Sequence, residues 1–237
     1  MQETILSAEL TSIHSAIRFQ EAYPSLLSQG KPTLKQSQGL GKSSYRHTKA
    51  MQEVYKVLQS GELGPLYAIE LISHKACNTS LEGRNCVIEL GAPLLELGLW
   101  ATGFPKILDA KGHLYANGER CSENTREAND YGLVLLELEN DISLQLCCSW
   151  HLAPTHEPML SATFYGINGG VAFKSIAGKP GQFMAERYAG PNTQTLYNPE
   201  NDPTASLDQH YLDAIAASVS KEKENRLTEV LDKIFRK

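Results

Sequence analysis

The feature that most constrains the fold of this 237-residue chain is a change in the spacing of its apolar residues. Before residue 105 they recur at helical intervals, and beyond it they alternate every second residue, as in strands. We predict strands at Lys106–Ala116, Tyr131–Leu138, Ile142–Trp150, Met159–Tyr165 and Val171–Ser175. Glu139-Asn140-Asp141 and the segment Gly166–Gly170 have the composition of hairpin turns. Strands joined by hairpins predict a largely antiparallel sheet, which excludes a doubly wound one.

Helical spacing is found mainly ahead of these strands. It predicts a first helix with its apolar stripe over Leu6–Ile17, which weakens near Pro24 and ends by Gly30. A second helix is capped by Thr48 and closed by Gly61, and a third covers Val87–Thr102. Pro93 lies inside the third, so a kink or a late helix start is expected. Alternation predicts one early strand, at Leu66–Ser73, and residues 206–237 are again helical in pattern. The fold expected is α+β: one open, mostly antiparallel mixed sheet with helices packed on one face.

Charge and hydropathy exclude several classes of partner. The net charge is −5 and the basic residues are scattered, so no surface for nucleic acid or for an anionic membrane is expected. Apolar runs such as Leu94–Trp100 are too short to span a bilayer. The polar start of the chain lacks the pattern of a signal peptide, which predicts a cytoplasmic protein. Five cysteines without a C-x-x-C pair predict neither a disulfide framework nor a structural zinc site.

Two polar clusters are candidates for ligand contacts. His151 and His156 follow a predicted strand beside Glu157, but Pro154 and Pro158 exclude the helix that would bring them together on a metal. We therefore expect them to face solvent or a substrate. Tyr45-Arg46-His47 gathers a phenol, a guanidinium and an imidazole just before a predicted helix. These side chains fit either a hydroxylated or anionic ligand or an interface, and both interpretations stay open.

A phosphate-binding loop is not expected at Gly39-Leu40-Gly41-Lys42-Ser43. The segment ends like a Walker A loop, but Gln36 stands where the leading glycine is required and no apolar strand precedes it. A linker is the better interpretation. The G-x-G-x-x-G fingerprint of dinucleotide-binding folds does not occur in the sequence.

Several segments, in order, resemble the C-terminal domain of the Gfo/Idh/MocA oxidoreductase family. They are Leu58–Tyr67, Cys86–Glu96 followed by Leu99-Trp100 and Gly103-Phe104-Pro105, Glu137–Asn140 with Ser149-Trp150, and Phe164–Gly170. The resemblance extends from about Tyr45 to Tyr188. It implies a two-domain enzyme in which a Rossmann domain binds NAD(P). The sheet domain of the family forms half of the substrate site and the dimer interface.

The nucleotide-binding half is not expected in this sequence. A doubly wound unit needs several β-α-β steps of roughly 30 residues each, and only 44 residues precede Tyr45. We therefore expect a helical arm and linker over residues 1–44, with a Rossmann remnant as one interpretation, and a sheet domain over residues 45–237. No complete Rossmann domain is predicted.

The catalytic positions of the family also differ here. Its loop lysine aligns with Ser37, and its central-helix histidine, the proton-transfer residue, aligns with Pro93. Because proline exchanges no proton, no catalytic residue is expected. The central helix keeps two carboxylates that could bind sugar hydroxyls. The candidate substrate-binding residues are Tyr45, Arg46, His47, Glu89, Glu96, His151 and His156, and no metal site is expected.

The sequence therefore favours a degenerate, cofactor-less relative that keeps the sheet domain for binding or assembly. One alternative is a subunit or fragment of an NAD(P)-dependent sugar or polyol dehydrogenase whose nucleotide domain is supplied elsewhere. Another is a regulator that senses a sugar or polyol. Apolar residues such as Leu133 and Val134 occupy both alternating positions of the predicted hairpin, so both sheet faces are expected to be partly buried. We expect a homodimer through the sheet face, or a heterodimer with a full-length relative.

Overall fold

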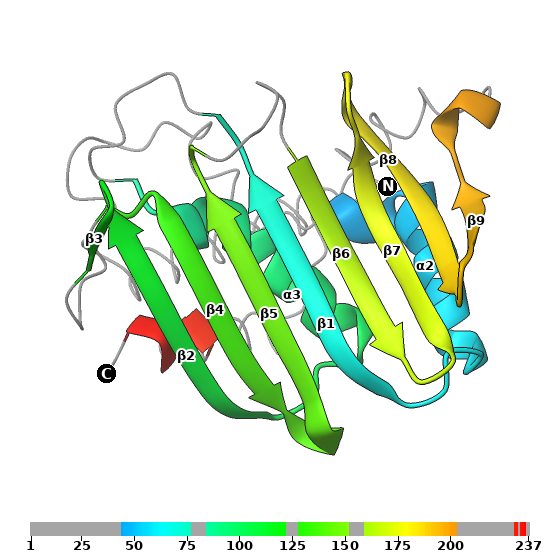
Figure 1. Cartoon of the computed structure of the whole chain (residues 1–237), viewed down its shortest axis with the longest axis horizontal. Coiled ribbons are helices and arrows are strands. Elements are labelled where there is room, and N and C mark those ends of the chain that lie inside the picture. The colour runs from blue at the N-terminus through cyan, green and yellow to red at the C-terminus, as the bar shows by residue number, and fades with distance from the viewer. Residues whose placement is uncertain are drawn as a thin grey trace, which may run out of the picture.

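A computed structural model describes residues 44–76, 84–121, 128–151, 159–202, 230–231 and 233–235 (Figure 1). The helix expected from Leu6, the linker and phosphate-loop segments, and Ser37 lie outside the described residues. So do His156 and most of the helical pattern beyond residue 206. The division of the chain at residue 44 therefore stays a prediction.

The described residues form one nine-stranded sheet in the order β3-β2-β4-β5-β1-β6-β7-β8-β9. The strands are β1 Leu66–His74, β2 Ile107–Ala116, β3 Glu119–Arg120, β4 Tyr131–Leu138, β5 Ile142–Ser149, β6 Met159–Gly166, β7 Gly169–Ile176, β8 Lys179–Ala189 and β9 Asn192–Tyr197. The central pair β1 and β5 is parallel, and the other pairs are antiparallel. The sheet is thus mixed and mostly antiparallel, as the sequence predicts, with none of the consecutive parallel pairs of a Rossmann fold.

Helix α2, Lys49–Ser60, has the boundaries that its capping residues predict. The Thr48 hydroxyl accepts a hydrogen bond from the Met51 amide at 3.2 Å, and Gly61 ends the helix with a φ of 73°. The buried side of the helix carries Met51 and Val54. This side packs against β7, β8 and β9, so α2 covers one end of the sheet.

Helix α3, Ala92–Ala101, begins late, as Pro93 predicts. A π-helical turn over Val87–Gly91 precedes it, and Pro93 occupies the first turn of α3, where its missing N–H would have no partner within the helix. A Cβ on Gly91 would lie 2.7 Å from Leu146 Cδ2, so glycine permits the close approach of this turn to β5. The π-turn and α3 cover the centre of the sheet.

The helices lie on one face of the sheet, which is the far face in Figure 1. On β4 and β5 this face carries Val134, Leu136, Leu144 and Leu146, all of them buried. At the β2 end the covering segment is the short helical stretch near Ile234, whose Cγ2 would contact a Cβ on Gly112 at 2.6 Å. Among the described helices none is long and apolar enough to cross a membrane.

The opposite face has no helix on it among the described residues; it is called the open face below (Figure 1). Its central side chains are Leu133, Leu135 and Glu137 on β4, Ser143, Gln145 and Cys147 on β5, and Ala68, Glu70, Ile72 and His74 on β1. Leu135 is 41% exposed. The adjacent thiols of Cys147 and Cys148 point to opposite faces, as alternation requires, and only Cys148 is fully buried.

The two faces of β4 make a matched test of this arrangement. Leu136→Ala removes a side chain that is 1% exposed beneath the helices, and we expect it to lower the free energy of unfolding by about 2–5 kcal/mol. Leu135→Ala, one residue away on the open face, should cost less than about 1 kcal/mol. Urea denaturation of both variants measures the difference. Equal losses would show that the strand is buried alike on both sides.

Candidate functional site

The central feature of the candidate site is a buried ion pair between the turn Ser44–His47, which precedes α2, and the middle of α3. Arg46 Nε donates to Glu96 Oε2 at 3.1 Å, and Arg46 Nη2 contacts the other carboxylate oxygen. Each residue is 8% exposed. The two partners are 50 residues apart in the chain. A guanidinium held through two nitrogens forms the strong, planar kind of charge-assisted pair.

Aromatic rings complete the surroundings of this pair. The Arg46 guanidinium carbon lies 5.4 Å from the Trp100 ring centroid and 5.8 Å from that of Phe104. Tyr55 of α2 stacks on Trp100 with ring centroids 4.6 Å apart. Burial lowers the pKa of Arg46 to about 10, so the guanidinium is still charged at neutral pH. The arginine thus holds α2 against α3 by charge and by ring packing together.

The local backbone explains why Arg46 turns inward. Residues Ser44–His47 form a 3-10 turn, and Gln52 Nε2 donates to the Arg46 carbonyl at 2.5 Å. Successive side chains of such a turn point about 120° apart. Tyr45 therefore packs against Phe173 and Phe183 over the sheet, while His47 is exposed to solvent.

The predicted Tyr45-Arg46-His47 cluster is therefore divided among three environments. Burial raises the pKa of the Tyr45 phenol, as expected for a core side chain. The pKa of His47 is lowered, mainly by partial burial and further by the charge of Arg46. Among the described residues, Arg46 is the member of this cluster that contacts another candidate residue, Glu96.

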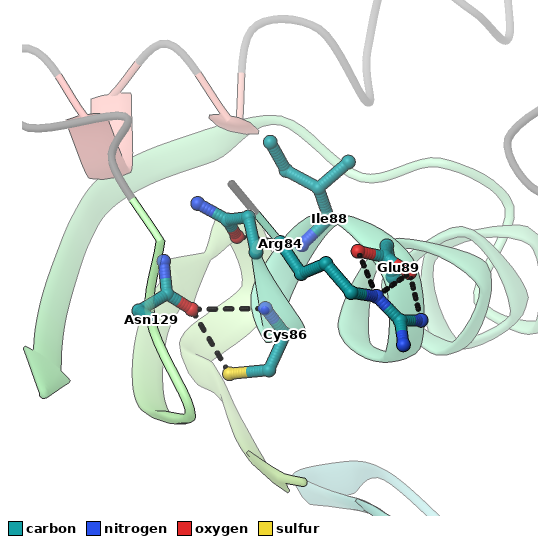
Figure 2. Close-up of polar contacts among 6 residues, drawn as sticks. Arg84, Cys86, Ile88, Glu89 and Asn129 are labelled. Carbon is teal, nitrogen blue, oxygen red and sulfur yellow. Dashed lines mark hydrogen bonds and ion pairs between the residues drawn. The ribbon is translucent and has the colours of Figure 1, made fainter. Parts of the chain in front are cut away.

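The second carboxylate of the central-helix pattern, Glu89, is also held by an arginine. Arg84 donates through Nε to both Glu89 oxygens, at 3.1 and 3.2 Å, and through Nη2 to one of them at 2.5 Å (Figure 2). The Arg84 guanidinium carbon also lies 4.2 Å from the Trp150 ring centroid. This pair is more open than the first, with side chains 33% and 36% exposed.

A buried amide network fixes the start of the π-turn. Asn129 Oδ1 accepts from both the amide nitrogen and the thiol of Cys86, each at 3.0 Å (Figure 2). Asn85 Oδ1 accepts a hydrogen bond from the Ile88 amide at 3.0 Å. It thereby caps one of the first N–H groups of the helical segment, which have no partner within the helix. Both asparagines are at most 2% exposed. This network anchors the segment that carries Glu89 and Pro93 to the chain entering β4.

The remaining sequence candidates lie apart from this site. His151 is at the end of β5, with its side chain 55% exposed and its Nε2 3.6 Å from Asp130 Oδ2. Pro93 is half-buried in the first turn of α3 and provides no group for proton transfer. The sequence interpretation missed Arg84, Trp100 and Phe104 as partners. A signal for the ion pair existed, because Glu96 is the one charged residue in the otherwise apolar run Ala92–Ala101 and requires a partner if that run is buried.

Comparison with solved structures shows what fold this is. The chain is similar to an oxidoreductase from Sinorhizobium meliloti (TM-score 0.59, 15% identity), covering 81% of this chain and 60% of that one. It is also similar to KijD10, a 3-ketoreductase from Actinomadura kijaniata in complex with NADP and TDP-benzene (TM-score 0.59, 14% identity, 81% and 60%). A third is levoglucosan dehydrogenase in complex with NADH and L-sorbose (TM-score 0.57, 12% identity, 81% and 62%). Neither a protein-family model nor a curated protein sequence matches.

These similarities confirm the expected fold. The described residues have the sheet domain that the resemblance to Gfo/Idh/MocA oxidoreductases predicts. The chain spans about three fifths of the length of those proteins. At identities of 12 to 15% the comparison establishes the fold, and the chemistry must be argued from this chain's own residues.

The two arginine–carboxylate pairs differ in burial, which gives a matched test. Glu96→Gln keeps the shape of the side chain but leaves the Arg46 charge buried without its counterion, so we expect a loss of about 3–5 kcal/mol in the free energy of unfolding. Glu89→Gln, in the more exposed pair, should cost about 1 kcal/mol or less. Chemical denaturation at pH 7 compares them. A loss below about 1 kcal/mol for Glu96→Gln would contradict the buried pair.

Proposed function

We propose that this chain is a non-catalytic relative of the Gfo/Idh/MocA oxidoreductases that uses the sheet domain for binding or assembly. The observation that carries the proposal is the state of the central-helix carboxylates. Glu96 is buried in a pair with Arg46, and Glu89 is held by Arg84. Both groups that could bind a polar substrate are thereby occupied within the chain.

Proton transfer is the second difficulty for catalysis. Oxidation of an alcohol to a ketone by hydride transfer requires a base for the hydroxyl proton, and a general base needs a titratable group within hydrogen-bond reach. Pro93 has none at the position where the family carries histidine. Glu96 already accepts a hydrogen bond from Arg46, and its burial keeps substrate away. These features support a binding role over hydride transfer.

The alternative is a dehydrogenase subunit or fragment whose nucleotide domain is supplied elsewhere. It is favoured by the similarity to NADP- and NADH-bound enzymes, of which this chain spans about three fifths. In that case a sugar or polyol would be the substrate class. A proton-transfer residue other than Pro93 and Glu96 would then be needed. For that reason we place the non-catalytic function first.

Assembly through the open face fits the composition of that face. Apolar and polar side chains are mixed there, and several polar groups already have partners within the sheet. Tyr165 donates to Glu70 at 3.3 Å, and Lys174 pairs with Glu186. A partner that covers these groups leaves no unpaired charge at Lys174 and Glu186. We propose a homodimer, or a heterodimer with a full-length relative, through this face.

Cofactor binding tests the non-catalytic proposal. We expect isothermal titration calorimetry of the purified chain with NAD(H) and NADP(H) to show no binding at micromolar to millimolar concentration, with a full-length relative such as levoglucosan dehydrogenase as the positive control. Pro93→His, which introduces an imidazole at the family position, should produce no dehydrogenase activity with sugars or polyols. Micromolar binding of either cofactor would favour the alternative function.

Sedimentation equilibrium tests assembly. The wild-type chain should sediment with twice the mass of one chain at micromolar concentration, because sheet-to-sheet contacts bury more than about 1,000 Å². Leu135→Asp places a charge in the proposed interface and should shift the population to monomer. The matched control is Ile167→Asp, which is 69% exposed in the β6–β7 turn and should leave the mass unchanged. A wild-type monomer would refute the dimer.

A further inference from the structure

A cleft on the open face lies at the opposite side of the sheet from the Arg46–Glu96 pair. Its volume is about 580 Å³, within the range of small-molecule sites, and it lies at the β2–β3–β4 end of the sheet. The side chains that matter for its chemistry are His113, Tyr115, Arg120, Asp130, Tyr131 and Leu133. Strand register places four of them on the open face, since Leu114 and Gly132 between them face the helices.

Arg120 gives the cleft a positive charge. Its Nη2 lies 2.9 Å from His113 Nδ1, and because a guanidinium can only donate, the histidine nitrogen is the acceptor in this contact. Within the described part of the chain Arg120 forms no ion pair with a carboxylate, unlike Arg46, Arg84 and Arg187. A guanidinium fork that has no acidic partner fits a planar carboxylate through two hydrogen bonds.

Two tyrosines and Leu133 form the uncharged wall of the cleft. The rings of Tyr115 and Tyr131 meet edge to face with centroids 5.8 Å apart. The Cys147 thiol donates to Tyr131 Oη at 3.5 Å, and this contact with burial raises the pKa of Tyr131 to about 12. The phenol is therefore protonated at neutral pH, and its hydrogen can be donated to a ligand. This wall offers apolar ring surface with one polar group.

The carboxylate of Asp130 is a hydrogen-bond acceptor in the lining of the cleft. Its Oδ2 accepts from the Asn117 amide at 2.7 Å and lies 3.6 Å from His151 Nε2. Asn117 is held in the β2–β3 turn with a φ of 53°, next to Gly118 at 81°. The turn thus fixes both the carboxylate and the strand that carries Arg120. Donors and an acceptor lie on the same cleft.

We infer that this cleft is a binding site for a small ring-bearing carboxylate, with the carboxylate on Arg120 and the ring against Tyr115, Tyr131 and Leu133. The ring is either aromatic or a sugar ring, and a hydroxylated ring could also donate to Asp130. The site does not depend on the non-catalytic role, because none of its residues contacts the Arg46–Glu96 pair. It shares the open face with the proposed interface and lies at the β2–β3–β4 end of that face.

The test is a titration of the full chain with sodium benzoate, sodium glucuronate and inorganic phosphate. Binding is measured by calorimetry and by the shifts of the backbone amide NMR signals. We expect benzoate or glucuronate to bind at millimolar concentration or below, with shifts centred on β2, β3 and β4, and phosphate to bind more weakly. Whichever of the two organic anions binds more tightly shows whether the site prefers an aromatic ring or a sugar ring. Arg120→Gln should weaken binding at least about tenfold, because a charge-assisted pair is lost. Arg120→Lys keeps the charge but lacks the two-pronged geometry of the guanidinium, so its affinity should lie between those of the wild type and Arg120→Gln.

Lys111→Gln is the matched control. It removes a cation from the same face of β2, where Lys111 pairs with Asp109 and does not line the cleft, and it should leave the affinity unchanged. Three results would overturn the inference. They are no binding of either organic anion up to about 10 mM, an affinity for phosphate equal to theirs, or wild-type affinity in Arg120→Gln.

Discussion

Among the described residues, a buried ion pair joins the turn before α2 to α3, and these two helices cover one end and the centre of the sheet. Helix α2 packs against β7, β8 and β9, and α3 packs over the centre, so Arg46 and Glu96 join the two parts of the helical layer. Removing two charges from water is costly unless their geometry and hydrogen bonds offset it. Leu94, Leu95, Leu97 and Leu99 surround Glu96 in the sequence and are buried. The carboxylate can therefore be tolerated only with Arg46 against it.

The same interaction connects structure to function. In the family that this sequence resembles, the central helix supplies polar groups to a substrate; here its two carboxylates are bound by arginines from the same chain. Pro93 has a structural role, because it lies in the first turn of α3, directly after the π-turn. Residues that the family pattern marks for chemistry thus stabilise the fold in this chain. The open face keeps the unpaired donors and ring surfaces that a partner or ligand would use.

The sequence predicted the elements whose signals are local. The alternation of apolar residues predicted both ends of β4 and the ends of β2, β5, β6 and β7 to within a few residues. Thr48, Gly61 and Pro93 predicted the helix boundaries. It missed β3, β8 and β9, because β3 has two residues, β8 has proline and glycine at its second and third positions, and β9 is largely exposed. The site was predicted less well. Adjacent candidates such as Tyr45 and His47 point apart in a 3-10 turn, whereas Arg46 and Glu96 meet only through the tertiary fold.

The central claim is that Glu96, a carboxylate that the sequence offers as a substrate ligand, is instead buried in a pair with Arg46. Nitrogen NMR of the arginine Nε–H groups, with Arg46 assigned by an Arg46→Lys variant, tests it most directly. The account predicts a slowly exchanging Arg46 Nε–H signal at neutral pH that does not move when sugars, polyols or NAD(P)H are added, because the guanidinium is buried and already bound. Rapid exchange with water, or a shift of that signal on adding any of these ligands, would show that the site is open and would contradict the account.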